Sequence, residues 1–123
     1  MNSNPVEPFV IYGKVGGIRN LDNRYEIHAD GSVLTHTPMG GRSIPTRSSI
    51  SEQELAQIIL LFYANNFFSM QPSYEPPKLP SLIMTHEITY RYEGEEHTMR
   101  ATNGGNPPQE FQNIVEGIEA IVR

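Results

Sequence analysis

The sequence contains no cysteine among its 123 residues, which excludes disulfides, thiolate catalysis and cysteine-type zinc sites. Long hydrophobic runs are also missing. The longest uninterrupted apolar stretch, Ile58 to Ala64, is far shorter than the ~20 residues that span a bilayer. The first residues have neither the basic nor the apolar segment of a signal peptide. We therefore expect a cytoplasmic protein, or an extracytoplasmic one if a leader has been removed.

Positive charge is scarce as well. Lys and Arg number 9 against 14 Asp and Glu, which gives a formal net charge of −5. A chain with this balance has little general attraction for nucleic acids or anionic membranes, so we expect neither as a partner.

Sequence motifs of catalysis and cofactor binding are absent too. The chain has no P-loop, dinucleotide fingerprint, nucleophile elbow or His-Glu-x-x-His motif. The segment Asn103-Gly104-Gly105-Asn106 precedes a helix, but the prolines after it remove two of the donors that an anion would need. These absences predict a protein that is not an enzyme and that holds no cofactor.

Length and patterning indicate a flexible leader over residues 1–8 and a single domain over residues 9–123. Residues 9–15 predict a first strand. Residues 24–29 and 32–37 predict a hairpin with a type I′ turn at Asp30-Gly31. That turn would set Ala29 opposite Ser32, Ile27 opposite Leu34 and Tyr25 opposite His36. Residues 38–50 are expected to form a long irregular loop, with Arg42 and Arg47 as a local basic spot.

The first helix has a clear beginning. Ser51 and Glu54 have the spacing of a capping box, and Leu55, Ile58, Ile59 and Phe62 follow at helical spacing. The neighbouring Leu60, Leu61 and Tyr63 widen this stripe, which predicts a helix buried on more than one side. The four prolines of residues 71–82 favour an extended surface connection.

A second hairpin is predicted from residues 85–92 and 95–102, with its turn at Glu93-Gly94. In this register Tyr92 faces Glu95, and Tyr90 faces His97. Arg91 would face Glu96, Thr89 would face Thr98 and Glu87 would face Arg100, which gives two pairs of opposite charge and a Thr–Thr pair on one face.

The last helix is expected to begin at Asn106, the cap, with Pro107 at its first position. Its amphipathic stripe comprises Phe111, Ile114, Val115, Ile118, Ile121 and Val122. The predicted fold is therefore α+β, with an antiparallel sheet of about five strands, two helices on one face and the order β-β-β-α-β-β-α.

Histidines and tyrosines supply the only candidate pocket in this pattern. The predicted hairpins place a tyrosine opposite each of His36 and His97, and a pocket between sheet and helices would be lined by Tyr25, His36, Tyr90, Tyr92 and His97. A zinc site would need these histidines to converge with a third ligand, which the spacing does not show, so we expect no metal.

Several segments together resemble the emfourin-like family of small bacterial domains, which includes an inhibitor of a thermolysin-like metalloprotease. The segments are Val15-Gly16-Gly17-Ile18, the helix that starts at Ser51 and ends in Phe67-Phe68, the hairpin from Tyr90 to Thr98, and the helix opened by Pro107-Pro108. Ile18-Arg19-Asn20 departs from the small-residue stretch of the family pattern. The resemblance implies the fold and a protein-binding role, with protease inhibition as one form of it.

The sequence therefore predicts a small non-enzymatic protein-interaction domain with a protein partner of unknown identity. Its glycine-rich and proline-rich loops are the natural contact segments. The candidate partner-binding residues are Gly16, Gly17, Ile18, Arg19, Asn20, Arg42 and Arg47. Two alternatives remain open: a small-ligand binder or weak hydrolase that uses the Tyr/His pocket, and a structural subunit of a larger complex that uses an exposed sheet edge.

Overall fold

One mixed, mostly antiparallel sheet of seven strands forms the frame of the protein, in the order β4-β3-β2-β1-β6-β7-β5. The computed structural model describes residues 8–17, 21–39 and 42–122, and only the backbone of residues 21, 37–39 and 42–44. Only β5 is parallel to its neighbour. The strands are β1 (Pro8–Gly16), β2 (Leu21–His28), β3 (Ser32–Met39), β4 (Arg42–Ser49), β5 (Ser73–Tyr74), β6 (Met84–Tyr92) and β7 (Glu95–Thr102).

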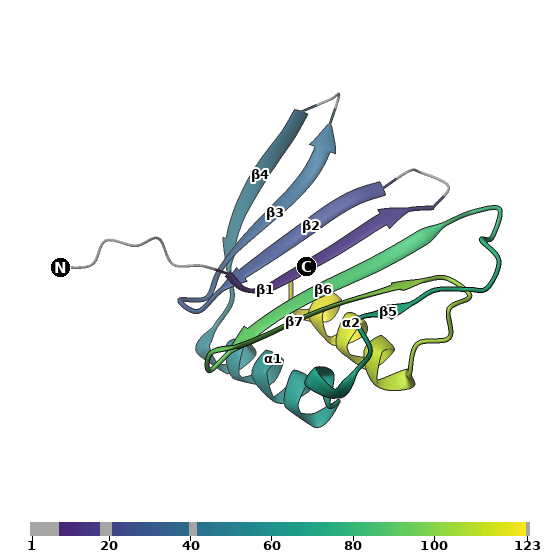
Figure 1. Ribbon diagram of the computed structural model, residues 1–123. Coiled ribbons are helices and arrows are strands. Elements are labelled where there is room, and N and C mark those ends of the chain that lie inside the picture. The colour runs from purple at the N-terminus through teal and green to yellow at the C-terminus, as the bar shows by residue number, and fades with distance from the viewer. Residues whose placement is uncertain (1–7, 18–20, 40–41, 123) are drawn as a thin grey trace.

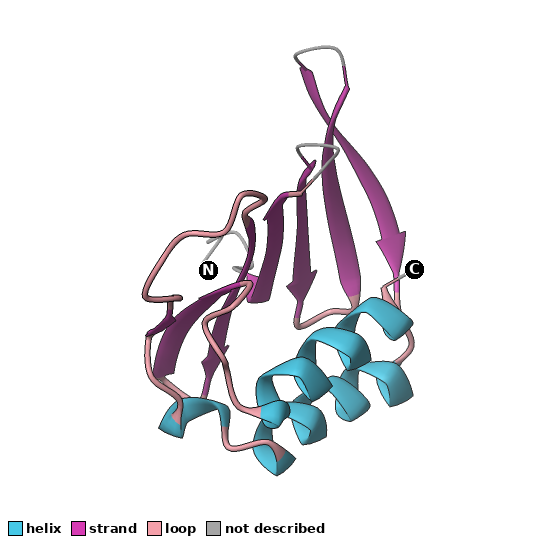
Figure 2. Cartoon of the chain, turned by 90° about the vertical axis from the view of Figure 1, so that its right-hand side faces the viewer, coloured by secondary structure: helices cyan, strands magenta, loops and turns pink. Residues whose placement is uncertain are grey.

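Two helices, α1 (Glu52–Ala64) and α2 (Gln109–Ile121), lie side by side on one face of this sheet (Figures 1 and 2). A short 3-10 helix, η1 (Phe67–Ser69), follows α1. Gly117 lets α2 approach α1 closely, because a Cβ there would collide with the side chain of Leu61. No helix in the described part of the chain is long and apolar enough to cross a membrane.

The core lies between the helices and the sheet. Val10, Tyr12, Ile27, Ile88 and Met99 are fully buried on the helix-facing side of the strands. From the helices they meet the buried residues Ile58, Phe62, Phe111, Ile114, Val115 and Ile118. The stripe predicted for the last helix is thus confirmed at its first four positions and at Val122, and Ile121 is partly buried against the core.

The predicted hairpin at Glu93-Gly94 is confirmed, with every predicted cross-strand pair in register. Glu93 and Gly94 have φ values of 52° and 83°, as a type I′ turn requires. The capping box at the start of α1 is also confirmed. The Glu54 N–H donates to Ser51 Oγ at 3.1 Å, and the Ser51 N–H donates to Glu54 Oε1 at 2.9 Å.

The predicted register of the first hairpin is wrong by one residue. Ile27 pairs with Val33, Tyr25 with Thr35, and Arg24 with His36. The connection is a three-residue loop over residues 29–31, in which the Gly31 N–H donates to the His28 carbonyl and Asp30 accepts from the Ser32 N–H at 2.9 Å. Because side chains alternate along a strand, this slip moves Val33 into the core and His36 to the opposite face.

Two strands were not predicted. The expected irregular loop over residues 38–50 forms the edge strand β4, which pairs along its whole length with β3. The connection over residues 71–82 contributes the short β5. We did not predict β4 because this segment has few apolar residues and contains Pro45. An edge strand tolerates both features.

The start of the first strand and the start of the last helix also differ from the prediction. Pro8 belongs to β1, and the remainder of the expected leader lies outside the described residues. Asn106 does not cap the last helix: its backbone is left-handed, with φ of 53°, and Pro108 occupies the N-cap of α2.

Candidate functional site

One face of α1 points away from the core and is apolar. Ala56, Ile59, Leu60 and Tyr63 lie on this face, where residues three and four positions apart are neighbours. Leu60 is 63% exposed and Tyr63 is 82% exposed. The prediction that these two side chains are buried is therefore wrong, because α2 and the sheet cover only the faces that carry Ile58, Leu61 and Phe62.

The wall opposite this helix face is formed by tyrosines of β6. Tyr90 and Tyr92 alternate with Arg91, so both lie on the helix-facing side of the sheet. Their rings are stacked, with centroids 5.9 Å apart. Phe62 of α1 stacks on Tyr90 at 3.9 Å, and Phe67 meets Phe62 edge-on at 5.0 Å. These ring contacts pack the tyrosine wall against α1 and η1.

Between these walls lies a groove of about 480 Å³, which we call the aromatic groove. No charged side chain lines it, and its side-chain polar atoms are tyrosine hydroxyls. The lining residues are Ala56, Ile59, Leu60, Phe62, Tyr63, Phe68, Tyr90 and Tyr92. A second hollow, of about 390 Å³, continues from it around η1 and shares Phe62, Tyr63 and Phe68 with it.

The electrostatics of the groove follow from burial. Tyr90 is almost fully buried, and this burial, reinforced by Tyr92 and by the negative charge of Glu93, raises the pKa of Tyr90 to about 12. Tyr90 is therefore a neutral phenol at neutral pH, and its ring packs against those of Phe62, Phe67 and Tyr92.

Of the five residues predicted to line a pocket, only Tyr90 and Tyr92 do so. Tyr25 stacks on Tyr12 at 5.9 Å, farther along the sheet. The ring of His97 packs against Phe67, and its Nε2 lies 2.9 Å from the Met70 carbonyl oxygen. His36 lies on the face without helices, where its Nε2 is 2.7 Å from Glu26 Oε2. The predicted set does not converge: the register of the first hairpin moves His36 to the other face, and Tyr25 lies on β2, which β1 separates from β6.

The described residues among those predicted to bind a partner do not line the aromatic groove. Gly16 and Gly17 have positive φ and lie against the start of β6, where the Gly17 N–H donates to the Ile83 carbonyl at 2.8 Å. Arg47 is exposed on β4. Ile18, Arg19, Asn20 and the side chain of Arg42 lie outside the described residues. Backbone packing accounts for the two glycines without a partner.

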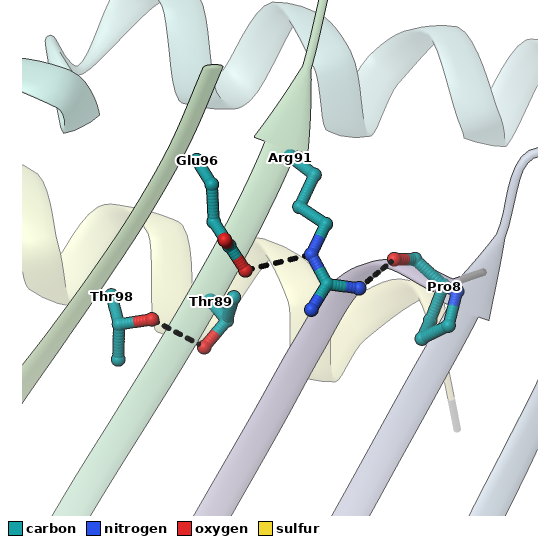
Figure 3. Close-up of polar contacts among 5 residues, drawn as sticks. All are labelled: Pro8, Thr89, Arg91, Glu96 and Thr98. Carbon is teal, nitrogen blue, oxygen red and sulfur yellow. Dashed lines mark hydrogen bonds and ion pairs between the residues drawn. The ribbon is translucent and has the colours of Figure 1, made fainter. Parts of the chain in front are cut away.

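The face of the sheet without helices carries a more polar hollow of about 350 Å³, beside Gly13, Thr85, Thr89 and Arg100. Glu87 and Arg100, which both line it, form an ion pair at 3.9 Å. Figure 3 shows two further cross-strand contacts of this face: Thr89 with Thr98 and Arg91 with Glu96. These contacts pair the named polar side chains of this face with one another.

Sequence reasoning missed the groove residues on α1 and η1. The available signal was an α1 sequence that is apolar on nearly all sides, from Leu55 to Tyr63. Such a helix is either buried all round or presents an apolar face to a ligand, and the periodicity is the same in both cases.

The fold and the groove together define a small α+β domain with an exposed aromatic groove. No protein-family model matches the chain, and no curated protein matches it either. The similarity to emfourin-like domains therefore stays a prediction.

Proposed function

We propose that this chain is a non-enzymatic protein-interaction domain, and that its aromatic groove docks an apolar segment of a partner protein. The observation that carries the proposal is the exposure of Leu60 and Tyr63 at the rim of the groove. The opposite wall, formed by Tyr90 and Tyr92, is already packed. Large apolar side chains at the edge of a preformed hollow are typical of interaction sites. The groove residues are mostly aromatic, and aromatic residues are enriched in protein interfaces.

The chemistry of the lining supports docking rather than catalysis. Tyr63, Tyr90 and Tyr92 offer rings for contact and hydroxyls for hydrogen bonds. None of the lining residues is a carboxylate, a histidine or a hydroxyl activated by a neighbouring base. The groove therefore offers contact area and shape.

Selection of random short peptides displayed on phage would test the proposal. We expect enriched peptides to carry aromatic or aliphatic residues, and to lose about tenfold or more in affinity on a Leu60→Glu variant. Leu79→Glu is the matched control, because Leu79 is also 63% exposed and lies in the proline-rich connection. Failure to enrich any peptide, or equal binding to the Leu60→Glu variant, would overturn the proposal.

Inhibition of a thermolysin-like metalloprotease is one specific form of this function, and the sequence resemblance supports it. The test is incubation of such proteases with micromolar amounts of the domain. A loss of protease activity that the Leu60→Glu variant fails to produce would place the contact at the groove. A panel with no inhibited protease would count against this form while leaving the wider proposal intact.

A second candidate function is the binding of a small apolar ligand. The volume of about 480 Å³ falls in the range of small-molecule sites, and two residues of the predicted pocket, Tyr90 and Tyr92, line the groove. Screening of aromatic fragments by NMR would separate the two candidates. Fragments that bind tightly and shift only groove resonances, together with no selected peptide, would favour the small ligand.

A further inference from the structure

The turn between β6 and β7 brings negative charge to one end of the aromatic groove. Tyr92, which lines the groove, pairs across the hairpin with Glu95, so both side chains lie on the same face of the sheet. Glu93 follows Tyr92 directly in the turn. Both carboxylates belong to exposed residues, and a hollow of about 340 Å³ at the turn is lined by them together with Arg91, Tyr92, Gly94 and Glu96.

In this hollow the three acidic residues, Glu93, Glu95 and Glu96, outnumber its one basic residue, Arg91. The basic residue of the turn region, Arg91, lies on the opposite face, where its Nε is 2.7 Å from Glu96 Oε1. Within the part of the chain that the structure describes, neither Glu93 nor Glu95 forms an ion pair. The charge of Glu93 also acts on the phenol of Tyr90 at the floor of the groove.

A further carboxylate lies beyond the groove-lining residues of α1. The apolar face of α1 continues toward its N-terminus at Glu52, four residues before Ala56 and therefore on the same side of the helix. No basic residue is among those that line the groove. The whole chain has a net charge of −5, so the electrostatic potential far from the groove is negative, as it is beside Glu93 and Glu95.

We propose that the aromatic groove selects a segment of a partner protein in which apolar residues lie beside a lysine or arginine, with the cation seated against Glu93 and Glu95. The inference rests on the proposed docking function and names the chemistry of its partner. An exposed Tyr92 ring beside the carboxylates adds a surface over which a lysine or arginine packs favourably. A second copy of this chain would bring its own negative charge to the groove and is disfavoured on that ground.

A charge-matched experiment tests this inference. Peptides enriched on the wild-type domain would be resynthesised with each Lys or Arg replaced by Gln, and their affinities measured for wild type, Glu93→Gln/Glu95→Gln and Glu110→Gln/Glu116→Gln. The last variant removes as much negative charge from exposed positions on α2. Thermal unfolding of each variant would verify that the hairpin remains folded, with Glu95→Gln alone as the milder change.

We expect basic residues in the enriched peptides and a loss of about threefold to tenfold in affinity on the Glu93→Gln/Glu95→Gln variant. The loss should disappear for the Gln-substituted peptides and shrink as salt is raised, while the α2 variant should bind like wild type.

The remaining outcomes separate the two proposals. Peptides without basic residues, or equal affinity for the Glu93→Gln/Glu95→Gln variant, would overturn this inference while the effect of Leu60→Glu kept the docking function intact. If Leu60→Glu instead abolishes association of the labelled chain with itself, the occupant is a second copy and the inference is wrong. Insensitivity to Leu60→Glu would reject the docking function first.

Discussion

At Gly16 the backbone and its neighbours together require glycine. Its φ is +105°, and a Cβ on it would collide with the Ile83 carbonyl oxygen, which is held in place because it accepts from the Gly17 N–H. Gly94 has a similar φ of +83° but open space around it. A comparison of these two glycines therefore separates the cost of a left-handed backbone from the cost of a steric collision.

We therefore predict that Gly94→Ala lowers the free energy of unfolding by about 1–2 kcal/mol, the cost of a left-handed alanine. Gly16→Ala should cost this amount and a further ~1–3 kcal/mol for the collision. Urea unfolding of the two variants would measure the difference. Equal losses would show that β6 moves aside without cost and that packing does not explain Gly16.

Tyr90 gives a prediction for the pH dependence of stability. Burial raises its pKa to about 12 from an ordinary value of about 10, so the folded state keeps a proton that the unfolded state loses. This contribution is fully present below about pH 10 and is lost as pH rises through about 12, on the order of 2 kcal/mol. Burial, and then the carboxylate of Glu119, raise the pKa of Tyr12 as well, and Tyr12 should act in the same direction.

The measurement is the free energy of unfolding between about pH 9 and about pH 12. Tyr90→Phe should flatten the decline, whereas Tyr63→Phe, at an exposed position, should leave it unchanged. A Tyr90→Phe profile that falls as steeply as wild type would assign the decline to other groups.

Among the elements, the two hairpins show what local sequence can and cannot specify. At Glu93-Gly94 the turn, the alternation and the charge pairs all favour one register, and that register is observed. At Asp30-Gly31 the same kind of dipeptide fits a two-residue turn or a three-residue loop. The hydrogen bonds from Ser32 to Asp30 stabilise the longer loop. Without charge pairs on the facing strands as a second signal, the dipeptide alone led to the wrong register.

The residues of the groove were also beyond what local sequence could specify. Periodicity predicted α1 and its cap, and Tyr90 and Tyr92 were recognised as candidate pocket residues. Which apolar face of α1 would remain exposed depends on where α2 and β6 pack, and those contacts are distant in sequence. Local patterns therefore could not separate the core residue Phe62 from the rim residue Tyr63.

The hairpin of β6 and β7 also allows a test of its cross-strand pairs. Arg91 lies between two acceptors, donating to Glu96 at 2.7 Å and to the Pro8 carbonyl at 3.3 Å (Figure 3). We predict a coupling energy of about 0.2–1 kcal/mol between Arg91 and Glu96 in a double-mutant cycle with alanine. Arg91→Ala should destabilise more than Glu96→Ala, because it also removes the bond to β1.

The matched control is the pair of Arg100 and Glu87, on the same face of the same hairpin but 3.9 Å apart. Its coupling should be smaller, since the longer pair lacks a direct hydrogen bond. If both cycles give the same coupling, the short Arg91–Glu96 contact adds nothing beyond general charge attraction.

For the molecule as a whole, an open sheet that is covered on one face has two edges to protect. One edge is the very short β5, and the other is the eight-residue β4. Short edges, prolines and charges on an edge strand all hinder pairing with another sheet. On β4 this role falls to Pro45, which has no N–H, and to the exposed Arg47.

We therefore predict that the double substitution Pro45→Thr/Arg47→Thr strengthens self-association, because it restores a backbone donor and removes a charge from the edge. Analytical ultracentrifugation over a range of concentrations would measure the association constant. Arg100→Thr is the control for net charge, since this exposed arginine lies at a position of β7 that pairs with both β6 and β5. Association that rises equally in the control would come from the changed net charge. Association that does not rise in the double variant would mean that the twist of the sheet alone protects this edge.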